Sequence, residues 1–185
     1  MRVISGTLKG RIIKGYNVLG TRPTMDRVKE SIFGTIQNYV KDSVCLDLFA
    51  GSGNLGIEAL SNGSKYCYFV DNNKEILKVL KDNINTFNLN DKCNISLLDY
   101  NKALEYFKDK ELKFDLIFID PPYLKNLIPE AMEIIDEKSM LDPDGLIVTK
   151  IDTSEEIFQG TRRIKLTRTK VYGNTTVCLY KMEDE

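Results

Sequence analysis

The sequence predicts an α/β domain with a mostly parallel seven-stranded sheet that ends in an antiparallel hairpin. Three observations lead to this class. Between residues 44 and 150, short apolar segments of strand length alternate with amphipathic helical segments, the order found in βαβ units. A glycine-rich turn joins the first of these strands to a helix. After residue 162, two segments of alternating polarity flank a Gly-Asn turn, which is typical of a hairpin.

A short extension precedes the βα units. Residues 2–5 and 11–14 have the composition of short strands, and Gly6 and Gly10 bracket the turn between them, so we expect an N-terminal β-hairpin. Residues 15–22 are expected to form a loop. Thr24 is then expected to cap a helix that begins near Met25. The apolar face of that helix has helical spacing and consists of Val28, Ile32, Phe33 and Ile36.

The remaining elements follow in order from the apolar pattern. Asp142-Pro143-Asp144-Gly145 predicts a turn just before the fifth strand. We treat residues 1–23 as an N-terminal extension and residues 24–185 as the main domain, which together form effectively a single domain. The expected strands are 44–49, 66–70, 95–98, 114–119, 146–150, 162–171 and 175–182, and the expected helices between them are 54–62, 73–87, 100–108 and 125–138.

Composition excludes several classes of protein. The chain has 185 residues, 42% of them hydrophobic and 29% charged, which is enough for one globular core. No apolar run approaches the ~18 residues of a membrane span, and the N-terminus lacks the apolar core of a signal peptide. The four cysteines are scattered, as expected for free thiols in the cytoplasm. There is no histidine, which excludes Ser-His-Asp triads and His-ligated metals, and we expect no metal cofactor.

The net charge of −1 conceals an uneven distribution. The first thirty residues and residues 161–181 are strongly basic, whereas the segment between them is acidic. If the two basic ends meet in the folded protein, they form a surface suited to a polyanion, because phosphate contacts dominate the affinity for nucleic acids. Chance placement of solvated charges is the other interpretation.

The glycine-rich turn predicts a nucleotide site. Gly51, Gly53 and Gly56 satisfy G-x-G-x-x-G between a strand and a helix, and Asp71 ends the next strand. Such a turn lets the backbone approach a ligand, and Asp71 with Asn72 beside it is placed to accept hydrogen bonds from a ribose. The contributing segment also includes Asp47, Phe49 and Ala50.

NAD and S-adenosylmethionine are both ligands of this kind, and the residues around the turn help to decide between them. Asp47 stands just before the glycine turn, and a carboxylate pointing into the site there would repel a pyrophosphate. It would suit the cationic methionine part of S-adenosylmethionine. Asp99, after the third strand, is placed to accept from an adenine amino group with Tyr100 beside it, although an N-cap role is an equal expectation for Asp99.

Asp120-Pro121-Pro122-Tyr123 follows the apolar strand 114–119 and is the expected catalytic segment. Neither proline can donate to a sheet, so the strand ends here in a stiff extended tip. The tip offers a carboxylate, free carbonyl oxygens and an aromatic ring. These groups suit a planar ligand that donates hydrogen bonds, such as the amino group of a nucleobase. An ordinary turn after a strand is the alternative for these four residues taken alone.

Together these residues resemble a known family. Asp47 to Gly53, Asp71, Asp99 and Asp120 to Tyr123, each at the end of a successive strand, resemble class I S-adenosylmethionine-dependent methyltransferases that modify exocyclic amino groups. The match is closer to the bacterial 16S ribosomal RNA (guanine-N2)-methyltransferases of the RsmD family. Segments similar to that family's are residues 2–6, 21–24, 26–33, 55–61 and 172–175.

The resemblance implies a Rossmann-like class I methyltransferase fold and transfer of methyl from S-adenosylmethionine, with S-adenosylhomocysteine as product, to N2 of a guanine. The target guanine would stack on Tyr123 and donate its amino hydrogens to Asp120 and a carbonyl at Pro121. The implied partner is ribosomal RNA or the small ribosomal subunit particle, and we expect a monomer. The extension at residues 1–23 is expected to contact the RNA, and residues 24–185 are expected to form the methyltransferase domain. The residues expected to contact RNA are Arg2, Arg11, Arg22, Thr24, Arg27, Arg162 and Arg163.

Three rival functions stay open at this point. The same acceptor geometry would serve a DNA adenine-N6 or cytosine-N4 methyltransferase, which usually needs a further target-recognition domain. An NAD-dependent oxidoreductase is disfavoured by Asp47 and by the absence of histidine. A non-catalytic RNA-binding assembly factor with a methyltransferase fold would be expected to show a degraded Gly51–Gly53 or Asp120–Tyr123 segment, and both segments are whole.

Overall fold

A computed structural model describes residues 1–15 and 23–183, and the side chains of Pro23 and Thr24 lie outside the description. The helices are α1 (Pro23–Val40), α2 (Asn54–Ser61), α3 (Lys74–Thr86), α4 (Tyr100–Asp109) and α5 (Leu127–Glu137). The strands are β1 (Val44–Asp47), β2 (Tyr66–Asp71), β3 (Cys93–Leu97), β4 (Phe114–Ile119), β5 (Leu141–Asp152), β6 (Ile164–Tyr172) and β7 (Thr175–Met182).

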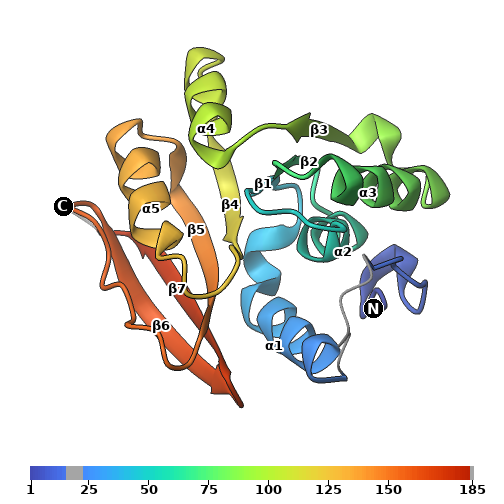
Figure 1. The fold of residues 1–185 in the computed structure, drawn as a ribbon, viewed down its shortest axis with the longest axis horizontal. Coiled ribbons are helices and arrows are strands. Elements are labelled where there is room, and N and C mark those ends of the chain that lie inside the picture. Colours follow the sequence, from blue (N-terminus) through green and yellow to red (C-terminus); the bar gives the residue numbers. More distant parts are fainter. Residues whose placement is uncertain (16–22, 184–185) are drawn as a thin grey trace.

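The seven strands form one sheet in the order β3-β2-β1-β4-β5-β7-β6 (Figure 1). The five strands from β3 to β5 are parallel, whereas β7 runs antiparallel between β5 and β6. The α/β class, the mostly parallel sheet and the terminal hairpin are therefore confirmed. The direction of winding reverses between β1 and β4, which is where an open α/β sheet binds its ligands.

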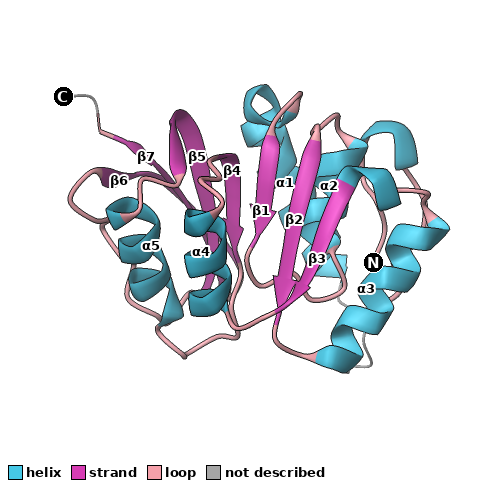
Figure 2. Ribbon diagram, turned by 90° about the horizontal axis from the view of Figure 1, so that it is seen from above, coloured by secondary structure: helices cyan, strands magenta, loops and turns pink. Residues whose placement is uncertain are grey.

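Two apolar cores lie on the two faces of the sheet. Helices α1, α2 and α3 contribute to one core, and α4 and α5 contribute to the other. Figure 2 shows α4 and α5 in front of the strands and α1 and α2 behind them. In β4, Leu116 and Phe118 face the first core and Ile117 and Ile119 the second, so this strand is buried on both sides. No helix among the described residues combines the length and apolar character needed to cross a membrane.

The two halves of the N-terminal segment pair in the antiparallel direction that was predicted, but they do not form the two regular strands that were expected. A single antiparallel bridge joins Arg2 to Ile12, and a 3-10 turn at Gly6–Leu8 fills the space between them. Val3 and Ile13 are buried against the α1–α3 core, which fixes the segment in place. The loop expected at residues 15–22 lies almost entirely outside the described residues.

A buried ion pair fastens this segment to the domain. Lys29 of α1 lies 2.9 Å from Glu58 of α2, and both side chains are at most 1% exposed. Glu58 also accepts hydrogen bonds from the backbone N–H groups of Ile4 and Ser5 at 2.9–3.0 Å. Lys29 donates further to the Arg2 carbonyl and to Asn54. We call these residues, Arg2, Ile4, Ser5, Lys29, Asn54 and Glu58, the N-terminal clasp.

Two local predictions were wrong. Helix α1 begins at Pro23, so Thr24 is inside the helix and is not its cap; proline fits the first turn because its missing N–H needs no partner there. Residues 142–145 were expected to form a turn before a strand, but β5 begins at Leu141 and includes them. They produce an irregularity in its pairing with β4, between the partners of Phe114 and Leu116.

Helix α1 contains an exposed glycine whose replacement should stabilise the protein. Added at Gly34, a Cβ would meet no atom within 4 Å, so Gly34→Ala is expected to raise the free energy of unfolding by ~0.5–1 kcal/mol through helix propensity. Urea denaturation followed by circular dichroism measures the change. Gly56→Ala in α2 is the contrasting variant and should be destabilised, because its Cβ would lie 2.2 Å from the Phe69 ring.

Candidate active site

A cavity of about 640 Å³ opens at the carboxyl ends of the central strands. It spans the reversal between β1 and β4, and its volume is in the range of ligand sites. One end is formed by the tips of β2 and β3 and the other by the tips of β4 and β5. Its lining residues are Met25, Leu48, Phe49, Gly51, Asp71, Asn72, Asn73, Ile76, Leu98, Asp99, Tyr100, Asp120, Pro121, Pro122, Tyr123, Leu127 and Lys150.

The three glycines of the turn have different roles. Gly51 has a φ of 57°, and a Cβ there would meet nothing within 4 Å, so this residue faces the open cavity. Gly53 has a φ of 91°, and a Cβ there would lie 2.5 Å from Leu80. Gly56 permits close packing of α2 on Phe69 of β2. One glycine thus faces the cavity, and two are required by conformation and packing.

Asp71 at the tip of β2 holds the glycine turn and lines the cavity at the same time. One carboxylate oxygen accepts from Gly51 N–H at 3.0 Å, and the other accepts from Asn73 N–H at 2.9 Å. Because each carboxylate oxygen has more than one acceptor site, both can still accept from hydroxyl groups of a ligand. Asn72 lines the same wall.

Asp99 follows the end of β3 and is the N-cap of α4. Its carboxylate accepts from Asn101 N–H at 3.0 Å at the start of α4, and Asp99 also lines the cavity. Beside it, the rings of Phe49 and Tyr100 are 5.4 Å apart, which gives this end of the cavity an aromatic wall. A wall of this kind with a carboxylate at its edge can hold a planar heterocycle and accept from its amino group.

Asp47 does not point into the cavity, contrary to the expectation. Its carboxylate is 1% exposed and accepts from Gly56 N–H at 3.0 Å, so it supports the turn from behind. Burial raises the pKa of Asp47 to about 7, which the Gly56 hydrogen bond opposes and the nearby charges of Asp120 and Asp71 reinforce. Ala50 and Gly53 are likewise not among the described residues that line the cavity.

The four residues Asp120 to Tyr123 all line the opposite end of the cavity. Tyr123 is 40% exposed, and its hydroxyl lies 3.3 Å from the Thr175 hydroxyl on β7. Its ring is therefore anchored at one edge while part of it stays open to a ligand. The chain then passes through Leu124 and Asn126, both with positive φ. A positive φ is unfavourable for residues other than glycine, and such conformations are concentrated at functional sites.

Lys150 of β5 is a site residue that sequence reasoning missed. Its ammonium lies 2.8 Å from the Asp120 carboxylate, and the Lys150 side chain is 8% exposed. Burial acts to lower the pKa of Lys150, but attraction to Asp120 outweighs it and the pKa is raised. The only feature of the sequence that could have indicated Lys150 is its position as a cation within the apolar run of the fifth strand. The pairing itself depends on the register that places Thr149 beside Ile119.

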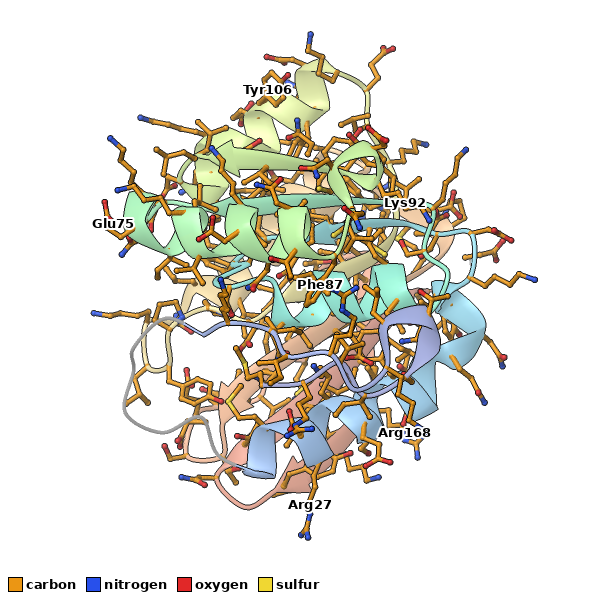
Figure 3. The ribbon with its side chains drawn as sticks, turned by 90° about the vertical axis from the view of Figure 1, so that its right-hand side faces the viewer. Arg27, Glu75, Phe87, Lys92, Tyr106 and Arg168 are labelled. Atoms are coloured by element: carbon orange, nitrogen blue, oxygen red, sulfur yellow. The ribbon has the colours of Figure 1, made fainter. Side chains whose placement is uncertain are left out.

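The residues expected to contact RNA do not form one group. Arg2, Arg11 and Arg27 are exposed on the side of α1 and the N-terminal segment. Arg11 packs on the Phe87 ring and donates to the Thr86 carbonyl, and Figure 3 shows Phe87 and, further along the same side, Arg27 directed away from the ribbon. Arg22 and the Thr24 side chain lie outside the described residues.

Arg162 and Arg163 lie at the other edge of the sheet, where β6 begins. The Arg163 guanidinium pairs with Asp136 near the end of α5, with Nε 2.6 Å from a carboxylate oxygen. It is therefore committed to a structural contact. The basic residues of β6 that reach the α1 side are Arg168 (Figure 3) and Lys170, which donates to Ser31 at 3.0 Å.

Comparison with known proteins shows which protein family the sequence and the fold resemble. The model of the family described as conserved hypothetical protein 95 matches residues 1–181. A protein of Bacillus subtilis named putative rRNA methyltransferase YlbH is 42% identical over 181 residues, which is 98% of each chain. The Haemophilus influenzae protein named ribosomal RNA small subunit methyltransferase D is 35% identical over 161 residues, covering 85% of this chain and 81% of that one. The solved structure titled putative methyltransferase yhhF from Escherichia coli has a TM-score of 0.86 at 28% identity and covers 100% of this chain and 99% of that one.

Proposed function

Because the chain belongs to the conserved hypothetical protein 95 family, we propose that it transfers a methyl group from S-adenosylmethionine to the exocyclic N2 of a guanine in small-subunit ribosomal RNA. One observation carries the proposal. A single cavity joins a nucleoside-type wall, with Asp71 and Asp99, to an amino-accepting tip, Asp120 to Tyr123. The names of its relatives supply the class of RNA.

The donor end of the cavity fits S-adenosylmethionine in its chemistry. Asp71 would accept from the ribose hydroxyls, and Asp99 would accept from the adenine amino group beside the Phe49–Tyr100 wall. Gly51 leaves room for the backbone to approach the ligand closely. When bound, S-adenosylmethionine supplies an electrophilic methyl group. Asp47 supports this end indirectly through Gly56.

The acceptor end would present the guanine amino group. The base would be turned out of its stack and held against Tyr123, a contact worth ~1–3 kcal/mol. The amino hydrogens would donate to the Asp120 carboxylate and to the Pro121 carbonyl. Both acceptors draw these hydrogens out of the base plane, which frees the nitrogen lone pair from the ring. Orientation of this kind can contribute ~7–11 kcal/mol to lowering a barrier.

No tuned general base is required. Once N2 carries the methyl group it is cationic and strongly acidic, so its proton passes readily to Asp120 or to water. This agrees with a chain that contains no histidine. The role of Asp120 is to accept hydrogen bonds, and its ion pair with Lys150 holds the carboxylate at the acceptor end of the cavity.

Residues 1–23 would contact the RNA backbone, together with Arg27 on α1. Arg2 of the N-terminal clasp is exposed, and Arg11 is exposed where it packs on Phe87 at the end of α3, so both charges are open to phosphates of a bound RNA. Binding should then weaken steeply as salt rises, because each phosphate contact releases counterions. The Arg162–Arg163 pair is removed from this proposed surface by its position at the other sheet edge.

The test is transfer of labelled methyl to unmodified small-subunit particles, naked ribosomal RNA and DNA in parallel, followed by nucleoside analysis. The expected product is N2-methylguanosine from RNA or from the particle. Label in N6-methyladenine or N4-methylcytosine of DNA would replace the proposal by the DNA-modifying alternative. S-adenosylmethionine binding without transfer to any substrate would favour a non-catalytic assembly factor.

A further inference from the structure

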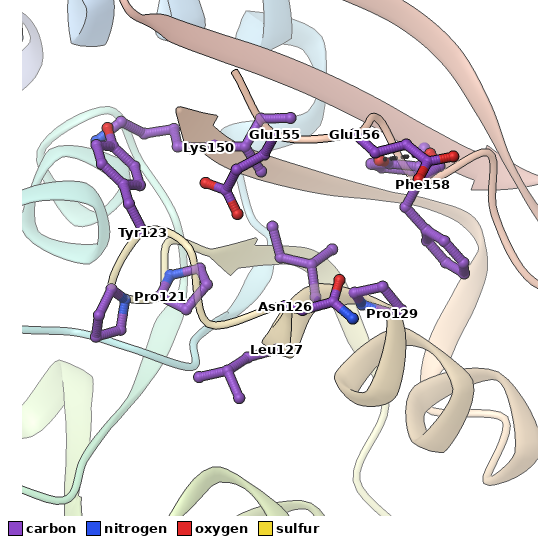
Figure 4. A pocket seen from close by; sticks show the side chains of 13 residues that line it. Pro121, Tyr123, Asn126, Leu127, Pro129, Lys150, Glu155, Glu156 and Phe158 are labelled. Atoms are coloured by element: carbon purple, nitrogen blue, oxygen red, sulfur yellow. Dashed lines mark hydrogen bonds between the residues drawn. The ribbon is translucent and has the colours of Figure 1, made fainter. Parts of the chain in front are cut away.

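Lys150 faces the space that the proposed guanine would occupy. It lines the main cavity together with Asp120 and Tyr123, and it also lines a narrower adjoining cleft. Figure 4 shows its side chain reaching from β5 toward Tyr123. A guanine that stacks on Tyr123 with its amino group at Asp120 would therefore have the Lys150 ammonium within reach of the same edge.

The ammonium has donors to spare. The Lys150 ammonium has three N–H bonds, and among the described residues it donates a hydrogen bond only to Asp120. Its side chain is 8% exposed, so water can serve the other donors only from the cavity side. A buried cation is costly unless its donors are satisfied, and a ligand acceptor in the cavity would satisfy one of them.

Guanine has the pattern of groups that this ion pair complements. Its pairing edge carries two neighbouring donors, N2–H and N1–H, followed by an acceptor, O6. Adenine and cytosine place a bare ring nitrogen next to their amino groups, and that lone pair would face the Asp120 carboxylate unfavourably. A carboxylate followed by an ammonium therefore matches guanine among the bases that have an exocyclic amine. Hydrogen bonding to exposed pairing edges is how proteins read single-stranded RNA.

We propose that Lys150 donates a hydrogen bond to O6 of the target guanine while Asp120 accepts from its donors, so that the Asp120–Lys150 pair selects guanine. The inference rests on the proposed function. It adds a base-selecting role that the Asp120–Tyr123 segment alone does not supply, because that segment accepts any exocyclic amine.

A single-atom change in the base tests this role. The substrate is an RNA oligonucleotide that contains the guanosine found to be methylated, made with guanine or with 6-thioguanine at that position. Sulfur replaces only O6 and is a weak acceptor, whereas N1–H and the amino group remain. Wild-type kcat/KM is expected to fall roughly 10- to 100-fold with 6-thioguanine, the range for a hydrogen bond to a charged group.

Lys150→Met should abolish the preference. It removes the donor at similar volume, so its kcat/KM is expected to be low on both substrates and nearly equal between them. If Lys150→Met instead slows both substrates by one common factor and keeps the wild-type ratio, Lys150 acts only on Asp120 and the inference is wrong. A wild-type protein that forms no methylguanosine would contradict the proposed function, which is a separate outcome.

Controls separate these effects from damage to the fold. Calorimetry with S-adenosylmethionine should give the wild-type affinity for Lys150→Met. Lys138→Met is the matched control, because Lys138 pairs with Glu105 at 2.7 Å, is 16% exposed and does not line the cavity. It should keep the wild-type preference for guanine. If Lys150→Met does not fold, Lys150→Leu, which also lacks a donor, replaces it, and an undiminished preference for guanine in that variant would overturn the inference.

Discussion

An Asp120→Ala variant is expected to bind S-adenosylmethionine with wild-type affinity and to transfer methyl at least ~10²-fold more slowly, the loss seen when a key electrostatic group is removed from an active site. The reason is positional. Asp120 lines the acceptor end of the cavity, whereas Asp71 and Asp99 line the donor end. Removing its carboxylate also leaves the Lys150 ammonium without its partner at 2.8 Å.

Single-turnover transfer measures the rate, and calorimetry measures the affinity for S-adenosylmethionine. Asp144→Ala is a suitable control, since Asp144 is an exposed aspartate in the irregular part of β5. It should leave both quantities unchanged. Turnover near the wild-type level in Asp120→Ala would be incompatible with the assigned role of the acceptor end.

A Glu58→Ala variant is expected to lose ~3–5 kcal/mol of stability, because removing one partner of a buried ion pair leaves the other charge uncompensated. Lys29 would remain buried at 1% exposure without its anion. The backbone N–H groups of Ile4 and Ser5 would lose their acceptor as well. Within the N-terminal clasp, this one carboxylate is the partner of Ile4, Ser5 and Lys29.

Equilibrium urea denaturation measures the loss. Glu75→Ala provides the contrast, because Glu75 and Lys78 form an exposed pair on α3, with 58% and 61% exposure. Exposed pairs contribute ~0–1 kcal/mol, so this control should be nearly neutral. An equally small effect of Glu58→Ala would show that the clasp does not hold the N-terminal segment.

The fold was largely predictable because the signal is local. Strand-length apolar runs and helical spacing identified each βα unit, and β4 was found with its observed bounds. Where prediction failed, tertiary contacts overrode local preference. Residues 142–145 have strong turn composition, yet they lie within β5 as an irregularity between Leu141 and Leu146, which both pair with β4. The N-terminal segment forms little regular strand because Glu58, far along the chain, satisfies part of its backbone.

The candidate site was predictable where residues follow strand ends. Asp71, Asp99 and Asp120 meet at one cavity because parallel strands bring their carboxyl ends to the same edge. Side-chain direction was not predictable in this way. Asp47 precedes the turn as expected but points to Gly56, and Arg163 is taken up by Asp136. Lys150 required knowledge of which strand lies next to β4.

The insertion of β7 between β5 and β6 has a consequence for how the protein is made. On the ribosome β5 emerges before β7, and β6 is joined to the sheet through β7, which follows both of them in the chain. Until residues 175–182 leave the exit tunnel, β5 presents an open edge that invites mispairing. The strand that carries Lys150 therefore reaches its final environment only after β7 has been made and has paired with it, so a nascent chain is expected to complete the acceptor site after residues 175–182 have emerged.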